Sequence, residues 1–144
     1  MVSNEEISVN KRNGRGKETL QIDKIHSMVG FATEGITGVS ASHVEMNSGI
    51  QFFDGVSTAD IQQILIKSAN DLISLENPNY QYVAARLLLF QLRKQLFHRL
   101  WDHPKFIDHI KTLIDKGLYD KDILVNYDES EIDRMGMWID HERD

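Results

Sequence analysis

Four basic side chains stand close together near the start of the chain, with no acid between them. They are Lys11, Arg12, Arg15 and Lys17. The Asn13-Gly14 pair among them favours a tight hairpin between two short strands, because both central residues of that turn need a positive φ. From Asp23 the apolar spacing becomes helical, so the hairpin leads into a helix whose first turn carries unpaired N–H groups and a partial positive charge. A basic ribbon followed by a helix N-terminus predicts an anion site of the kind that binds phosphate.

The rest of the sequence contains no recognisable catalytic constellation. Gly16 and Lys17 resemble a fragment of a P-loop, but Lys11 and Glu18 stand where that motif needs a glycine and a hydroxyl residue. The six histidines have no metal-ligand spacing and are interpreted as surface or packing residues. The acidic pairs near the C-terminus lie in a helical, solvated context, whereas acid–base catalysis needs a pocket that separates two pKa values. We therefore expect binding rather than chemistry.

Composition narrows the class of partner. The chain has 144 residues, a formal net charge of −6 and no cysteine, which excludes disulfides, thiolate metal sites and thiol chemistry. Residues 120–144 contain nine acidic and three basic residues, so the basic ribbon is a local patch on an acidic protein. Such a patch suits a small polyanion better than a nucleic-acid duplex. With no secretory signal and no apolar run of roughly 18 residues, we expect a cytoplasmic protein without membrane or direct nucleic-acid partners.

Apolar periodicity predicts a mainly helical α+β fold. Helices are expected over 23–34, from 40 or 42 to 50, from 57 or 58 to about 76, over 80–97 and over 105–116, followed by acidic helical turns. Asp23 is predicted to cap the first helix and Ser57 or Thr58 the third, with stops at Gly35 and Gly117. The segment 80–97 is apolar on nearly every side, which predicts a central helix covered by the others. Its charged residues Arg86, Arg93 and Lys94 must therefore reach the rim or meet an anion.

Three stretches, taken together, resemble one protein family. They are Lys11-Arg-Asn-Gly14 with Glu18-Thr-Leu-Gln-Ile-Asp-Lys-Ile25, then Phe52-Phe-Asp-Gly-Val-Ser-Thr58 with Asp60-Ile61, and Pro78-Asn-Tyr-Gln-Tyr82 with Ala84-Ala-Arg86 and Leu92-Arg-Lys94. In this order and spacing they are similar to the ATP-cone at the N-terminus of the large (alpha) subunit of class I ribonucleotide reductase. Phe106-Ile-Asp-His and the final Ile139-Asp-His-Glu-Arg-Asp144 resemble the segment that joins the cone to the catalytic barrel in bacterial and phage enzymes.

The resemblance implies a four-helix bundle capped by a small β-sheet over residues 7–98, and a short helical segment over 99–144 that would lead into the barrel. It implies allosteric binding of ATP, which activates ribonucleotide reduction for DNA synthesis, and of dATP, which inhibits it. Magnesium would be held through the nucleotide phosphates, without protein ligands. The implied nucleotide-binding residues are Lys11, Glu18, Thr19, Leu20, Gln21, Ile22, Asp23, Lys24, Thr58 and Lys94. Of these, Lys11, Lys24 and Lys94 would contact phosphate.

The resemblance also implies partners, namely the remainder of the alpha subunit and the small, radical-generating beta subunit, in the cytoplasm or the host cytoplasm of a phage. Reduction in this family needs cysteines, so this chain cannot be catalytic alone and is expected to be a fragment or a split-gene piece. Gln62 and Gln91 stand where many relatives carry histidine, which puts the strength of dATP inhibition in doubt. Two alternatives remain open: a free-standing ATP-cone regulator, and a helical interaction module that no longer binds nucleotide.

Overall fold

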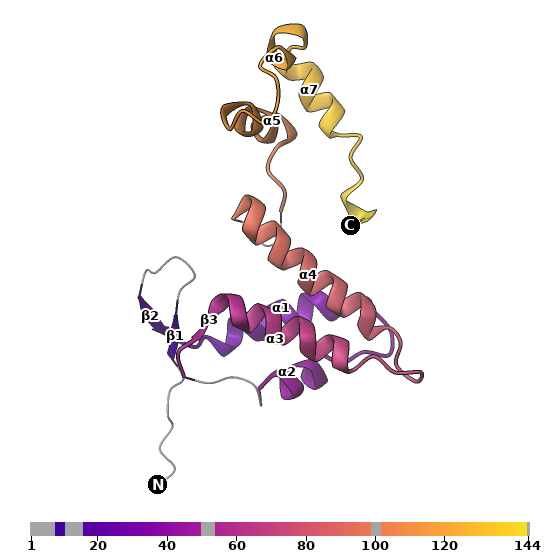
Figure 1. Cartoon of the computed structure of the whole chain (residues 1–144). Coiled ribbons are helices and arrows are strands. Elements are labelled where there is room, and N and C mark those ends of the chain that lie inside the picture. Colours follow the sequence, from indigo (N-terminus) through magenta and orange to yellow (C-terminus); the bar gives the residue numbers. More distant parts are fainter. Residues whose placement is uncertain (1–7, 11–15, 50–53, 99–101, 144) are drawn as a thin grey trace. The chain divides into compact units, whose positions relative to one another are not determined.

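The computed structural model describes residues 8–10, 16–49, 54–98 and 102–143. These form a mainly helical protein with one small sheet (Figure 1), as the periodicity predicts. The chain divides into two compact units, Met1–Leu92 and Arg93–Asp144. Elements up to the division are β1 Ser8–Asn10, β2 Lys17–Thr19, α1 Ile22–Thr33, α2 Ala41–Gly49, β3 Val56–Ser57, α3 Thr58–Asp71 and α4 Tyr80–Phe97, which crosses it. Those beyond are α5 Phe106–Asp115, α6 Ile123–Asn126, α7 Glu129–Gly136 and the 3-10 turn η1 His141–Arg143. Within the described part of the chain, no helix is both long and apolar enough to span a membrane.

The sheet has the strand order β2-β1-β3. Strands β1 and β2 pair antiparallel with Val9 opposite Glu18, which confirms the two strands of the predicted ribbon. The Asn13-Gly14 turn expected between them lies outside the described residues. Strand β3 pairs parallel to β1, with Val9 opposite Val56 and Asn10 opposite Ser57. Periodicity did not predict β3, because two residues are too few to show a period.

The sheet separates the ribbon residues onto two faces. Val9 and Val56 are buried at 2% and 0% exposure, and Glu18, in the same row, is half-buried. Because side chains alternate along a strand, the neighbouring Lys17 points to the opposite, exposed face, with Asn10 in its row. Lys17, the member of the basic run that lies among the described residues, is therefore directed away from the face of Glu18.

Helix α1 begins one residue earlier than predicted. Its N-cap is Gln21, so Asp23 lies in the first turn and is not the cap that the sequence suggested. An acid in that turn still suits the helix dipole. The helix ends before Gly35, whose φ of +70° matches the predicted stop. Arg86 of α4 reaches the C-terminal end of α1, where one of its guanidinium nitrogens donates hydrogen bonds to the carbonyls of Ala32 and Glu34.

Helix α3 is capped as predicted, since the Ser57 hydroxyl accepts a hydrogen bond from the Asp60 amide. Ile61, Leu65 and Ala69 form its buried face.

The expectation that α4 is covered on all sides is wrong. Val83 and Leu87 are fully buried, but Tyr82, Leu88, Leu92 and Leu96 are each about half exposed. A helix that is apolar all round needs neighbours all round, and in the first unit α4 is buried along one face, which carries Tyr80, Val83, Leu87, Phe90 and Gln91.

The second unit has its own small core. Ile107 and Ile110 of α5 pack with Ile132 of α7. Helix α7 starts with a complete capping box, in which Asp128 accepts from the Glu131 amide and Glu131 accepts from the Asp128 amide. Helix α5 ends at Asp115 with Lys116 as its C-cap, and Gly117, the predicted stop, follows with φ +69°.

Two helical glycines give a matched test of this packing. A Cβ added at Gly136 would lie 2.6 Å from Phe106 Cβ, whereas one added at Gly30 in α1 meets nothing within 4 Å. We expect Gly136→Ala to destabilise the second unit by about 1–3 kcal/mol through overpacking. Gly30→Ala should instead stabilise α1 by about 0.5–1 kcal/mol, because alanine has the higher helix propensity. Urea unfolding of both variants checks the opposite signs; equal midpoints would contradict the close approach of Phe106 to Gly136.

Candidate functional site

The implied binding residues 18–24 form one continuous segment that leaves the sheet and enters a helix. Glu18 and Thr19 end β2, Leu20 is half-buried, and Gln21 is the N-cap of α1. Ile22, Asp23 and Lys24 make up the first turn, where all three are exposed. The segment therefore presents, in order, an acid, a hydroxyl, an amide and a cation at the start of a helix.

The start of α1 suits an anion. Gln21 makes no side-chain cap hydrogen bond, and its carbonyl accepts from the Lys24 amide at 3.1 Å. A helix start without a side-chain cap can direct its first amides, with the positive end of the dipole, at a bound anion. The adjacent Ile22 is 70% exposed, so an apolar surface lies beside the polar one. A ligand with a flat apolar part and an anionic part would match both.

Thr58 is brought towards this segment through the central strand. It is the first residue of α3 and is half-buried. Ser57 before it pairs with Asn10 of β1, while Glu18 pairs with Val9 on the other edge. Residues two strands apart are separated by about 10 Å, a span that a nucleotide can bridge. The sequence placed Thr58 and Glu18 forty residues apart, so the sheet brings them together.

Two other implied residues are not placed beside them. Lys11 lies outside the described residues. Lys94 is exposed in the last turn of α4 and belongs to the second unit, so its role at the phosphates stays a prediction.

Asp54 also lies in this region, although the resemblance implies no role for it in binding. Its Oδ1 atom accepts hydrogen bonds from the Ser8 hydroxyl at 2.6 Å and the Ser8 amide at 2.8 Å. These two bonds, with a smaller contribution from the charge of Lys17, lower the pKa of the Asp54 carboxyl. Since the pKa is lower in the folded state, the ionised carboxylate contributes stability at neutral pH that is lost as the pH falls through the folded value.

Gln62 and Gln91 form a buried polar seam between α3 and α4. Gln62 is 4% exposed and donates from Nε2 to the Leu87 carbonyl at 2.9 Å. Gln91, 9% exposed, accepts from Gln63 Nε2 at 3.0 Å. The apolar periodicity of α3 could not reveal this burial, because Gln62 is polar and its partner, the Leu87 carbonyl, lies on another helix.

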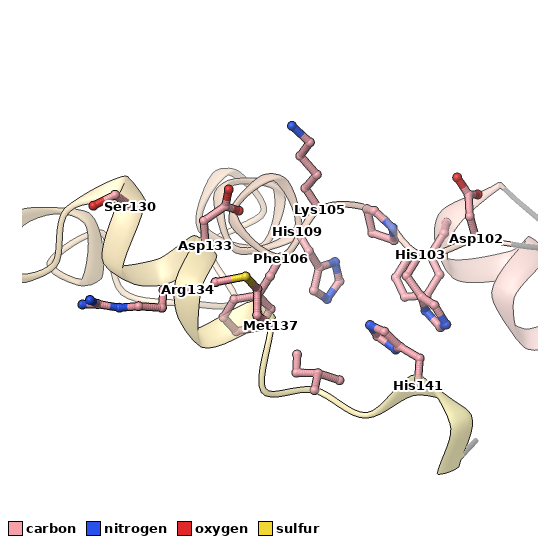
Figure 2. A pocket seen from close by; sticks show the side chains of 14 residues that line it. Asp102, His103, Lys105, Phe106, His109, Ser130, Asp133, Arg134, Met137 and His141 are labelled. Atoms are coloured by element: carbon pink, nitrogen blue, oxygen red, sulfur yellow. The ribbon is translucent and has the colours of Figure 1, made fainter.

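A hollow of about 760 Å³ lies in the second unit, and none of the implied nucleotide residues lines it. Figure 2 shows His103, His109, His141, Phe106 and Met137 around it, while Lys105 and Arg134 point away. The His103 and His141 rings are stacked with centroids 3.9 Å apart, and Phe97 packs edge-on against His103 and His109. These histidines pack against other rings, and no group of three or more metal-ligating side chains occurs in the part of the chain described.

The mainly helical fold with its small three-stranded sheet is consistent with the family that the chain matches. The model of the ATP cone domain matches residues 7–95, which is more than half of the chain. The chain therefore belongs to the ATP-cone family.

The curated relatives of the chain are alpha subunits of ribonucleoside-diphosphate reductase. The chain is 44% identical over 141 residues to the ribonucleoside-diphosphate reductase 1 subunit alpha of Escherichia coli K12. It is 45% identical over 141 residues to the alpha subunit of Haemophilus influenzae and 40% over 138 residues to that of Enterobacteria phage T4. These alignments cover 96–98% of the chain but 18% of each relative. The resemblance to the ATP-cone region of bacterial and phage reductase alpha subunits is thus confirmed.

Proposed function

We propose that this chain is the nucleotide-sensing region of a ribonucleoside-diphosphate reductase alpha subunit, with ATP and dATP as its allosteric effectors. The observation that carries the proposal is the position of the helix start: the ATP-cone match includes an α1 N-terminus without a side-chain cap, preceded by Glu18 and followed by Lys24. Helices α1 to α4 would form the four-helix cone, with the sheet as its cap. ATP would keep the enzyme active and dATP would switch it off.

The described residues fit a nucleotide. The first amides of α1 and the Lys24 ammonium would hold phosphate oxygens, since charge-assisted bonds to an anion are stronger than neutral ones. The exposed Ile22 and the half-buried Leu20 would cover the base, while Glu18 and Thr58 would bond to polar ligand atoms. Lys11 and Lys94 would complete the phosphate site. Mg²⁺ would be bound by the phosphates and need no protein ligand.

The catalytic role would belong to other parts of the enzyme. The chain has no cysteine and spans 18% of the length of its relatives, so we propose that it acts by binding. Its partners would be the remainder of the alpha subunit and the beta subunit, in the cytoplasm. A switch requires that ATP and dATP differ in affinity for two states of the whole enzyme, and such couplings are typically about 1–3 kcal/mol.

Calorimetric titration of the folded 144-residue chain tests the proposal. With Mg²⁺ present, we expect ATP and dATP each to bind and to compete with each other for the cone. Circular dichroism on the same sample verifies that the helices are formed. Heat from neither nucleotide, in a folded sample, would overturn the proposal and favour the helical interaction module.

A further inference from the structure

The turn before β3 is fastened to the central strand by more than the ladder between the strands. Asp54 Oδ1 accepts from both the amide and the hydroxyl of Ser8. The Gly55 amide donates to the Ser8 carbonyl at 2.8 Å, and Asn10 Nδ2 donates to the Gly55 carbonyl at 2.7 Å. We call these four residues, Ser8, Asn10, Asp54 and Gly55, the β1 clasp. Gly55 has φ +81°, a conformation that a residue with a side chain adopts at a cost.

The clasp is needed because β3 is so short. Among the described residues, two pairs define the parallel ladder, namely Val9 with Val56 and Asn10 with Ser57. Parallel strands are slightly less stable per residue than antiparallel ones, so two pairs alone leave the register of β3 weakly specified. Asp54 precedes the ladder by two residues and extends the fixed contact to Ser8. It thereby sets which residue of β3 lies opposite Asn10.

The register of β3 decides where Thr58 lies. Ser57, the last residue of β3, is the N-cap of α3, and Thr58 follows directly as the first helical residue. Across β1, Glu18 pairs with Val9. A slip of β3 by one residue would move Thr58 by about 3.3 Å along the strand and turn its neighbours to the opposite face. The clasp thus fixes Thr58 with respect to Glu18.

We propose that Asp54 is a positioning residue for the effector nucleotide, which holds Thr58 at its place relative to the β2 ribbon without contacting the ligand. The inference rests on the proposed function. Asp54 acts from the outer side of the sheet: its partner Ser8 alternates with Val9, whose side chain is buried with that of Val56. The carboxylate is therefore directed away from the face that Glu18 shares with Val9.

A double-mutant cycle tests the positioning. Affinity for Mg-ATP is measured by calorimetry on the full chain for Asp54→Ala, Thr58→Val and the combination. We expect Asp54→Ala to weaken binding about 2- to 30-fold, the range typical of mutations that act on a site through another residue. Once the Thr58 hydroxyl is removed, the further effect of Asp54→Ala should fall below about twofold. A merely structural role would lower affinity by the same factor in both backgrounds.

Two further variants separate geometry from charge and from loss of fold. Asp54→Asn keeps an oxygen that accepts from Ser8, so it should retain affinity within about threefold. Asp71→Ala, at the exposed end of α3, is the matched control and should bind as the wild type does. If Asp54→Ala does not fold, Ser8→Ala, which removes one of the two bonds, replaces it in the cycle.

The outcomes are distinct. Wild-type affinity of Asp54→Ala for Mg-ATP would overturn the positioning role while leaving the proposed function intact. An equal loss of affinity from Asp54→Ala with and without the Thr58 hydroxyl would do the same. Absence of ATP and dATP binding by the wild-type chain overturns the proposed function and the positioning role together.

Discussion

Replacing Lys24 by alanine is expected to weaken the binding of ATP and dATP about 10- to 150-fold, which corresponds to about 1.5–3 kcal/mol for a charge-assisted contact. Lys24 lies in the first turn of α1, where its ammonium and the helix amides would act on the same phosphate. Removal of the charge leaves the dipole alone to attract the anion. Lys24→Arg should retain most of the affinity, since the positive charge is kept.

The matched control is Lys67→Ala. Lys67 is an exposed lysine inside α3, so its replacement changes the net charge equally but removes no predicted ligand contact. Binding of Mg-ATP is compared by calorimetry at two salt concentrations, because the loss of a direct phosphate contact should also reduce the salt dependence of affinity. Equal affinities of the two alanine variants would remove Lys24 from the site.

The second large effect concerns stability. Leu65 of α3 is 0% exposed, and its truncation to alanine should cost about 2–5 kcal/mol through lost burial and the cavity that remains. For a domain of this size each kcal/mol shifts the melting temperature by roughly 4–8 °C, so a fall of about 10 °C or more is expected. Saturating ATP should raise the melting temperature of the variant and of the wild type, because the ligand binds the folded state.

Leu75→Ala provides the comparison for this loss. Leu75 follows α3 and is fully exposed, at 103% relative exposure. Its replacement removes the same atoms without removing packing, so stability should stay within about ±0.5 kcal/mol of the wild type. Similar melting temperatures for the two leucine variants would contradict the burial of α3 against its neighbours.

The helices were predictable because their signals are local. The period of Ile61, Leu65 and Ala69 marked the buried face of α3, and Ser57 marked its start, since a side-chain cap depends on residues only a few positions apart. The start of α1 was misplaced by one residue because Asp23 is the better capping type. The chain enters α1 two residues after the end of β2, so Gln21 takes the cap position. The position of β2 in the sheet therefore decides the start of α1, although Asp23 is the residue type that more often caps a helix.

What could not be predicted depends on partners distant in sequence. One face of α4 stays exposed because few helices pack on it. The periodicity of α4 itself cannot show how many helices will cover it. The burial of Gln62 depends on the Leu87 carbonyl, twenty-five residues away. The clasp at Asp54 needs Ser8, forty-six residues earlier.

The amino-acid sequence by itself determined the class of fold and the family, because residue types, local spacing and the three quoted stretches suffice for these. Only the tertiary structure decided the geometry around residues 18–24. It turned Lys17 away from the face of Glu18 and placed Thr58 directly after β3, which pairs with the central strand β1 on the side opposite β2. The physical reason is that strand pairing joins residues by register rather than by distance along the chain, and two short strands acquire their register from contacts such as that of Asp54 with Ser8.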